Sequence, residues 1–316
     1  KMAEFRADEF EALFQQTKAL PWEQLIPPDG RFTVTGTSVK SKLHSVPACQ
    51  KIVKKAIVDR LGETYGIETF EETGAEYTVK ATLLKDRVTL TVDTSGTGLH
   101  KRGYRQADVA APIKETLAAA MIQLSFWNAD RILIDPCCGS GTIPVEAAMI
   151  GRNIAPGLNR SFACEGWELI DESIWKEEKK AAFEAIRYDK KLQIYGFDIN
   201  KKAVSAAREN AGEAGVDDCI VFGRNDVANL RAVGKNGIII TNPPYGERIG
   251  EAEQIEAIYK ALGGFMTEHP DWSLFMVTTD KEAEEKVMGR KAERRRKLYN
   301  GRLEVCYYQF HGKRVQ

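Results

Sequence analysis

Residues 237–245, Gly-Ile-Ile-Ile-Thr-Asn-Pro-Pro-Tyr, join an apolar run to a rigid polar turn. The three isoleucines are β-branched and predict a short buried strand. The two prolines end that strand, because neither can donate a backbone hydrogen bond to a sheet. A residue before proline is also pushed to an extended backbone, so Asn242 is expected at the carboxyl end of the strand.

The carboxyl ends of the strands are where an open α/β sheet binds its ligands. An amide side chain, a proline carbonyl and an aromatic ring that project from one turn can hold a planar group with an exocyclic amine. Taken alone, the stretch is equally compatible with a simple turn that ends a strand. The rest of the chain decides between these interpretations.

Acidic residues follow three other predicted strands. Asp135 follows the strand at 131–134, Asp198 ends the strand at 192–197, and Asp226 comes shortly after the strand at 219–222. Each acid alone is most simply a helix cap. Because the carboxyl ends of parallel strands meet at one edge of a sheet, the three acids and the 242–245 turn together predict a single crevice.

The first of these acids opens a glycine-rich loop, Asp135-Pro136-Cys137-Cys138-Gly139-Ser140-Gly141-Thr142, before a helix to about residue 150. Glycines in this position let the backbone approach a ligand closely. A dinucleotide fingerprint needs a third glycine where this chain has Pro144, and Asp135 would repel a pyrophosphate. A nicotinamide dehydrogenase is therefore disfavoured. An acid at this position suits a cationic ligand, such as the amino group of a sulfonium amino acid.

The order of predicted elements indicates the fold class. From residue 111 onward strands alternate with helices, and Asn300-Gly301 joins two strand-like runs as a hairpin. This pattern predicts an α/β fold with a doubly wound, mostly parallel sheet closed by an antiparallel hairpin. The first part reads as α+β, with helices at 5–20 and 46–61 and a strand pair at 77–84 and 88–92.

Charge and composition limit the classes of function. The 316-residue chain has 45 basic and 45 acidic residues, so a nucleic-acid surface must be a local patch. Basic residues cluster in three places. The first and the last are also compatible with an ordinary solvated surface, and the middle one looks like a linker that could also touch phosphate. The candidate RNA contacts are Lys40, Lys42, Lys51, Lys54 and Lys55, then Lys101, Arg102 and Arg105, and finally Arg295 and Arg296.

Cysteine and hydropathy patterns indicate a cytoplasmic protein. The six cysteines form no CxxC pair and no metal-ligand spacing with the four histidines, so we expect reduced thiols and no metal. No apolar run reaches the roughly 18 residues needed to span a bilayer, so no membrane partner is expected. No obligate protein partner is evident.

The two main motifs together resemble a known class of enzymes. Asp135–Thr142 followed by Thr241–Tyr245 is similar to the S-adenosylmethionine-dependent methyltransferases that modify exocyclic nitrogens of adenine or guanine. Further stretches sharpen the resemblance to the THUMP-domain guanine-N2 methyltransferases of large-subunit ribosomal RNA, many of which carry an older label of N6-adenine-specific DNA methylase. These stretches are 99–105, 111–118, 146–149 with 155–158, and Asn242 through Glu247-Arg248.

The resemblance implies a cofactor, a substrate and residue roles. The cofactor is S-adenosylmethionine, released as S-adenosylhomocysteine, and the substrate is the N2 amine of a guanine in 23S ribosomal RNA. Asn242 and Pro243 accept hydrogen bonds from the target amine, and Pro244 and Tyr245 complete the catalytic turn, with Tyr245 stacking on a base that has been turned out of its stack. The implied cofactor residues are Pro112, Lys114, Asp135, Pro136, Cys137, Gly139, Ser140, Gly141, Thr142, Asp198, Ile199, Asp226, Val227 and Asn242.

Two other functions stay open at this point. The turn holds an amine without distinguishing adenine from guanine, so an N6-adenine methyltransferase on DNA or RNA is an alternative. The chain is also compatible with an RNA-binding or ribosome-assembly factor that binds the cofactor without turnover.

The resemblance also suggests domain boundaries. We expect a seven-stranded Rossmann-like methyltransferase domain at 111–316 with a helical insertion at 151–191, after an α+β THUMP domain at 1–93 and a linker at 94–110. Family members carry a small ferredoxin-like piece before the THUMP domain. Its absence here predicts that the sequence is truncated at its N-terminus.

Overall fold

The computed structural model describes residues 1–105, 113–245 and 251–313. The chain forms two compact units. One comprises Lys1–Gly98 and Ser161–Glu178, and the other comprises Leu99–Arg160 and Lys179–Gln316. The predicted insertion at 151–191 is thus divided, because its middle part belongs to the first unit.

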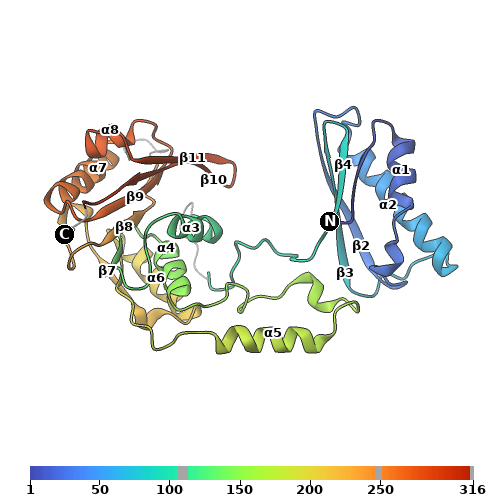
Figure 1. The fold of residues 1–316 in the computed structure, drawn as a ribbon, viewed down its shortest axis with the longest axis horizontal. Helices are drawn as coiled ribbons and strands as arrows, with labels where there is room; N and C mark the ends of the chain where they lie inside the picture. Colours follow the sequence, from blue (N-terminus) through green and yellow to red (C-terminus); the bar gives the residue numbers. More distant parts are fainter. Residues whose placement is uncertain (106–112, 246–250, 314–316) are drawn as a thin grey trace. The chain divides into compact units, whose positions relative to one another are not determined.

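The first unit is built on a four-stranded sheet with the order β1-β4-β3-β2. Its strands are β1 (Ala3–Arg6), β2 (Arg31–Val39), β3 (Glu76–Leu84) and β4 (Arg87–Asp93). β2 and β3 are parallel, and the other two pairs are antiparallel. α1 (Phe10–Lys18) and α2 (Val46–Tyr65) lie on one side of this sheet, as Figure 1 shows. The short η1 (Trp22–Gln24) places the fully buried Trp22 in the same core.

The predicted helix at 5–20 is wrong at its start. Residues 3–6 pair with β4 as a strand, and α1 begins only at Phe10. Phe5 and the apolar residues of α1 share a helical spacing by coincidence, and pairing with a distant strand overrides the local pattern. The expected helix at 46–61 and the strand pair after it are confirmed, with α2 extending to Tyr65.

The segment 161–178 adds to the core of the first unit. It contains η2 (Ala163–Gly166) and the first part of α5 (Glu172–Glu184). The ring of Trp167 stacks on Tyr77, with 4.8 Å between the ring centroids, and its indole nitrogen donates a hydrogen bond to the carbonyl oxygen of Glu76 at 3.1 Å. The segment is therefore fixed by an aromatic anchor of the kind that dominates core packing.

The second unit contains a seven-stranded sheet with the order β10-β11-β9-β8-β5-β6-β7. The strands are β5 (Leu133–Asp135), β6 (Ile194–Asp198), β7 (Ile220–Arg224), β8 (Ile238–Thr241), β9 (Ser273–Thr278), β10 (Arg294–Asn300) and β11 (Leu303–Phe310). The five strands from β9 to β7 are parallel, while β11 runs antiparallel to both β9 and β10. The predicted fold class, including the hairpin at Asn300-Gly301, is confirmed.

Helices cover both faces of this sheet (Figure 1). One face packs against α3 (Glu115–Gln123), α4 (Thr142–Gly151) and α6 (Lys201–Glu213), and the other against α7 (Glu251–Glu268) and α8 (Ala283–Met288). The isoleucines of β8 alternate between these two cores: Ile238 and Ile240 belong to the first and Ile239 to the second. A strand that is buried on both faces needs apolar residues at every position, which explains the uninterrupted run of isoleucines in β8.

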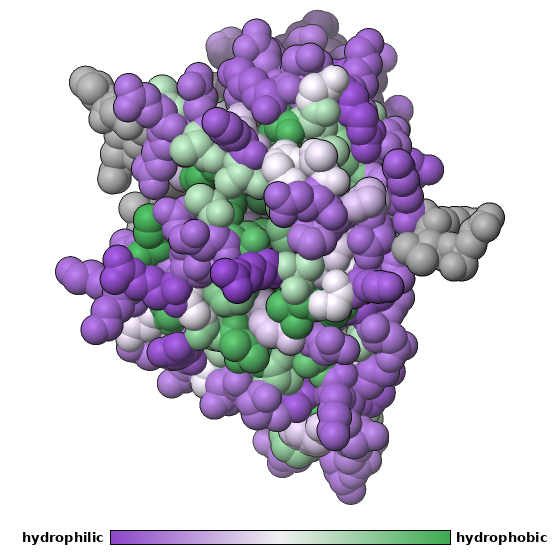
Figure 2. Space-filling model, turned by 90° about the vertical axis from the view of Figure 1, so that its left-hand side faces the viewer, coloured by the Kyte–Doolittle hydropathy of each residue, from purple (hydrophilic) through white to green (hydrophobic). Residues whose placement is uncertain are grey.

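The face of the molecule drawn in Figure 2 is largely hydrophilic. Hydrophobic side chains gather in the middle of this face, and hydrophilic ones surround them. Among the helices of the described residues, none combines the length and the hydropathy required to cross a membrane.

Candidate active site

The carboxyl ends of β5 and β8 are joined by a buried hydrogen bond. Asp135 is the last residue of β5 and Thr241 the last residue of β8, and these strands are neighbours in the sheet. The Thr241 hydroxyl donates to Oδ1 of Asp135 at 2.8 Å, and the backbone N–H of Cys137 donates to the same oxygen at 3.1 Å. The two motifs predicted from sequence, 135–142 and 241–245, are therefore brought together by direct contact.

The Asp135 carboxyl group is almost completely buried, with 1% of its surface exposed. Burial raises its pKa from an ordinary value near 3.8 to about 7, against the lowering effect of the hydrogen bonds from Thr241 and Cys137. The nearby Asp198 raises this pKa further. A cation placed against Asp135 would favour the carboxylate, so the site suits a positively charged ligand group.

The glycine-rich loop offers space beside this carboxyl group. Gly139 has a φ of +53° and no heavy atom within 4 Å of the position that a Cβ would occupy. Gly141 has a φ of +80°, and a Cβ there would lie 2.9 Å from the Cβ of Ala207 on α6. The first glycine thus leaves the loop open toward a ligand, and the second permits close packing of α4 on α6.

Other residues keep this loop in place. The buried Asn210 of α6 donates from its amide to the carbonyl oxygen of Ser140 at 3.0 Å. Within the loop itself, Pro136, Ser140 and Thr142 are buried. Burial raises the pKa of the Cys137 thiol far above its ordinary value, so no thiolate lies beside Asp135.

Asp198 and Asp226 lie at the same edge of the sheet. Asp198 accepts hydrogen bonds from the N–H groups of Gly139 at 3.0 Å and Asn200 at 2.8 Å, one on each carboxylate oxygen. Both oxygens keep a lone pair for a further donor, such as a hydroxyl group. Asp226 is exposed and caps η4 (Val227–Asn229), with Oδ1 accepting from the N–H of Ala228 at 2.9 Å.

Two apolar side chains accompany these acids. Ile199, directly after Asp198, leaves 51% of its surface exposed, whereas Val227 is buried. An exposed isoleucine next to an oriented carboxylate is suited to cover the face of a planar ring.

The Asn242–Tyr245 turn presents its polar groups at the end of β8. The Tyr245 hydroxyl donates a short hydrogen bond to Oδ1 of Asn242, and the Tyr245 ring packs against the core formed with α3, α4 and α6. Pro243 is buried and Pro244 is exposed. An amide oxygen has two lone pairs, so Asn242 keeps one for an amine donor.

The expected residues of the preceding helix are only partly described. Lys114 precedes α3, and its backbone N–H donates to Oδ1 of Asn300 on β10 at 3.4 Å. Pro112 lies outside the described residues, as do the end of the predicted linker, the start of the predicted 111–118 motif, and Glu247 and Arg248.

Arg102 and Arg105, expected as RNA contacts, are engaged inside the second unit. Arg102 contacts Glu146 at 3.4 Å, and their side chains are 11% and 3% exposed. Arg105 contacts Glu115 at 3.0 Å and donates to the Thr142 hydroxyl at 2.9 Å. These guanidinium groups neutralise buried carboxylates and brace the start of α4, so the local charge run does not become a surface patch.

The basic residues of the first unit are on its surface. Lys40, Lys42, Lys51, Lys54 and Lys55 are all exposed. Lys42 pairs with Asp8 at 2.7 Å and Lys54 with Glu72 at 3.8 Å, and exposed pairs of this kind are weak enough to be exchanged for other anions.

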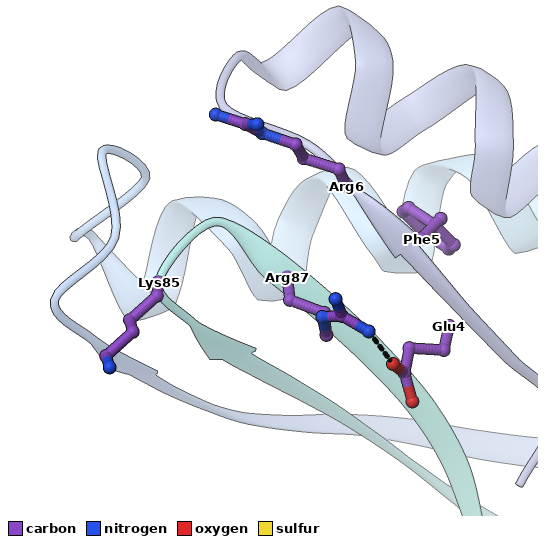
Figure 3. A pocket seen from close by; sticks show the side chains of 5 residues that line it. All are labelled: Glu4, Phe5, Arg6, Lys85 and Arg87. Carbon is purple, nitrogen blue, oxygen red and sulfur yellow. Dashed lines mark hydrogen bonds and ion pairs between the residues drawn. The ribbon is translucent and has the colours of Figure 1, made fainter.

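Three further cations gather at the β3–β4 turn. Arg6, Lys85 and Arg87 line a hollow of about 370 Å³ together with Glu4 and Phe5. Figure 3 shows Arg87 turned toward Glu4, while Arg6 and Lys85 point away from that pair. Sequence reasoning missed this group, because Arg6 and Arg87 become neighbours only through the β1–β4 register.

The remaining candidate RNA contacts, Lys101, Arg295 and Arg296, differ in exposure and in their partners. Lys101 is exposed. Arg295 pairs with Glu284 of α8 at 2.8 Å, and Arg296 is half-buried on the other face of β10.

Within the described ranges, no group of three or more His, Cys, Asp or Glu side chains is arranged to hold a metal ion.

Comparison with known proteins places this site in a family. The family described as "RMKL-like, methyltransferase domain" matches residues 102–309, about two thirds of the chain and the whole site described above. The chain belongs to the RMKL-like methyltransferase family. A THUMP domain also matches residues 7–93, ahead of the RMKL-like methyltransferase domain.

Individual relatives agree with this assignment. The chain is 49% identical over 99% of its length to a Bacillus subtilis protein named "Putative RNA methyltransferase YpsC", and it covers 82% of that protein. It is 35% identical to the ribosomal RNA large subunit methyltransferase K/L of Syntrophotalea carbinolica, over 98% of this chain but only 45% of that protein. The solved structure of SMU.472 in complex with SAH superposes with a TM-score of 0.93 at 44% identity, covering all of this chain and 84% of that one.

Sequence reasoning missed several residues that support the RMKL-like site. Thr241 stands in the sequence only as the first residue of the motif, yet it contacts Asp135. Asn210 on α6 and the Arg105–Glu115 pair also support the loop. The sequence offers one signal for Asn210, which is its helical spacing with the alanines of α6 at 203, 206, 207 and 211.

Proposed function

We propose that this protein transfers a methyl group from S-adenosylmethionine to the exocyclic N2 amine of a guanine in 23S ribosomal RNA. The observation that carries the proposal is the hydrogen bond between Thr241 and Asp135, because it sets the Asn-Pro-Pro-Tyr turn directly beside the glycine-rich loop. A relative bound to SAH and relatives named as ribosomal RNA methyltransferases support the cofactor and the substrate class.

The residues of the loop fit this cofactor. Asp135 would hold the amino group of the cofactor. Burial disfavours the charged form of this carboxyl group, and a cation beside it would stabilise that form. The open space at Gly139 would admit its amino-acid part. Asp198 would accept from the ribose hydroxyls and Asp226 from the adenine amine, with Ile199 against the adenine ring.

When bound, the cofactor supplies a methyl group on a positively charged sulfur. The protein's part is to present the target amine to that methyl carbon. The free lone pair of the Asn242 amide oxygen and the carbonyl oxygen of Pro243 would each accept an N–H of the amine, which draws its lone pair out of conjugation with the base. The hydrogen bond from Tyr245 holds the Asn242 amide in one orientation before the substrate arrives.

The exposed lysines of the first unit would supply affinity for the RNA backbone. Lys51, Lys54 and Lys55 lie on the outer face of α2, and Lys40 and Lys42 follow β2. Such contacts neutralise phosphates without reading sequence.

The test is the substitution Asn242→Ala, assayed with undermethylated large-subunit ribosomal RNA and labelled S-adenosylmethionine. We expect the turnover rate to fall by a factor on the order of 10²–10³, because a group that aligns the reacting atoms is lost. Cofactor affinity should change less than about threefold, because in this proposal the amide oxygen of Asn242 faces the target amine and contributes little to holding the cofactor. The exposed Asn128, at the opposite end of the sheet, provides the control Asn128→Ala. Wild-type turnover by Asn242→Ala would refute this assignment.

A further inference from the structure

The β10–β11 hairpin extends beyond the rest of the sheet. β9 pairs with β11 only from Cys306 to Phe310, so Leu303, Glu304 and Val305 pair with β10 alone. We call residues 297–305 the arm. Figure 1 shows this ribbon reaching past the end of β9 and over α3.

The registers locate the arm relative to the Asn242 turn. Thr241 is level with Met276 of β9, and Met276 is level with Tyr308 of β11. β11 is two strands away from β8, which is a lateral offset of roughly 10 Å at the usual strand spacing. From Tyr308 back to Leu303 the strand advances by about 17 Å at the usual rise per residue. The tip therefore stands beside and beyond the edge where Asn242 lies.

The arm is anchored and not a loose ribbon. A two-stranded ribbon alone is marginally stable in water. Here Leu298 packs on the core formed with α3, and Asn300 accepts from the backbone N–H of Lys114 at the start of α3. Gly301 has a φ of +67°, which the tight turn requires.

The tip carries groups that suit a nucleic-acid strand. From Arg294 to Glu304 there are five basic residues and one acidic residue. The Tyr299 ring is 54% exposed, on the face opposite to Leu298, and Lys297 lies 5.5 Å from its centroid. Arg302 is exposed at the turn, and no hydrogen bond or ion pair joins its side chain to another residue of the described chain.

We propose that the arm binds the RNA strand next to the target nucleotide, with Tyr299 as the stacking platform for a neighbouring base and Arg302 as a phosphate contact. Base stacking on an exposed aromatic ring and neutralisation of the backbone are the two interactions that single-stranded RNA offers without a sequence requirement. This inference rests on the proposed function for the nature of the substrate. It moves the C-terminal RNA contact from Arg295 and Arg296, which are engaged or half-buried, to the tip.

Charged residues on an edge strand can also serve to prevent two sheets from joining edge to edge. The test separates this role from RNA binding. The variants are Tyr299→Ala, Tyr299→Phe and Arg302→Glu, with Arg294→Glu as the matched control. Arg294 is also exposed on β10, but it lies opposite Gln309 at the base of the hairpin. All of these side chains are on the surface, so folding should be retained.

The readouts are the KM for undermethylated large-subunit ribosomal RNA, the KM for S-adenosylmethionine, and the anisotropy of a short fluorescein-labelled single-stranded RNA. Tyr299→Ala should raise the KM for RNA at least about fivefold, the lower end for loss of one stacked base. Tyr299→Phe should stay near wild type, because it keeps the ring and loses only the hydroxyl bond to Glu304. Arg302→Glu should raise the same KM and reduce the salt dependence of binding, with an unchanged KM for the cofactor.

This design distinguishes a failure of the role proposed for the arm from a failure of the proposed function. Wild-type RNA affinity and KM in both Tyr299→Ala and Arg302→Glu, or an equal loss in Arg294→Glu, would overturn the role of the tip. If the wild-type protein transfers no methyl group to RNA, the proposed function fails, and the anisotropy series still decides whether the arm binds the strand.

Discussion

The substitution Thr241→Val removes the hydroxyl group that reaches Asp135 while keeping the size of the side chain. In the structure this hydroxyl is one of two donors to Oδ1 of a carboxyl group that is 1% exposed. A hydrogen bond to a charged group is worth about 1.5 kcal/mol at the lower end, which corresponds to roughly one pKa unit. The pKa of Asp135, about 7 in the wild-type protein, should therefore rise by about that amount.

The direction in which pH changes cofactor affinity follows from the charge of the Asp135 carboxyl group. A cationic amino group is attracted by the carboxylate and not by the protonated acid, so affinity is full above the pKa and is lost as the pH falls through it. For a pKa near 7, affinity should drop about 25-fold between pH 7.5 and pH 5.5. In Thr241→Val the affinity should be about threefold weaker than wild type at pH 7.5 and about tenfold weaker at pH 5.5.

The assay is titration calorimetry with S-adenosylhomocysteine over this pH range, where the ligand's own amino group stays mostly protonated. Thr278→Val is the matched control, because Thr278 is a buried threonine at the end of β9 that contacts Tyr259 and not Asp135. Affinity that is independent of pH in the wild-type protein would refute the reasoning about Asp135. A pH profile that is identical in Thr241→Val and wild type would refute the role of the hydroxyl group.

Three further predictions test the supporting structure. Arg102→Ala leaves the buried Glu146 without its cation and should lower the free energy of unfolding by about 3 kcal/mol in urea, whereas Lys180→Ala breaks an exposed pair and should cost less than about 1 kcal/mol. Gly263→Ala places a Cβ closer to the Val287 carbonyl oxygen than van der Waals radii allow, so it should destabilise the folded protein by about 1–3 kcal/mol. Gly264→Ala on the same helix has no atom within 4 Å of the new Cβ, so it should stabilise the folded protein by up to about 1 kcal/mol. Urea unfolding measures both changes. Replacing Lys51, Lys54 and Lys55 with Gln should weaken RNA binding. The slope of log affinity against log salt concentration should become shallower by about 0.7 for each phosphate that the protein no longer neutralises. The same change at Lys176, Lys179 and Lys180 is the control, and an equal effect there would argue against the α2 face.

The strand-end motifs were predictable because they depend on local rules. The alternation of strands and helices, the prolines after Thr241 and the glycines at 139 and 141 each restrict the backbone where they stand, and parallel strands put their carboxyl ends at one edge. Asn300-Gly301 predicted its hairpin for the same reason.

Features that depend on distant partners were not predictable in this way. The strand at 3–6 forms because β4 lies beside it, and the segment 161–178 joins the first unit because Trp167 finds Tyr77. Arg102 and Arg105 resembled a surface patch in the sequence, and only the packing of α3 and α4 shows the buried carboxylates that they neutralise. The roles of Thr241 and the arm likewise follow from strand order and register.

Identification of the methylated nucleoside tests the proposed methyl transfer most directly. The wild-type protein is incubated with labelled S-adenosylmethionine and large-subunit ribosomal RNA that lacks its modifications, with duplex DNA in parallel, and the products are digested to nucleosides. We expect label in N2-methylguanosine from the RNA and none in the DNA. Label in N6-methyladenine, or no label while the cofactor still binds, would contradict the proposed function.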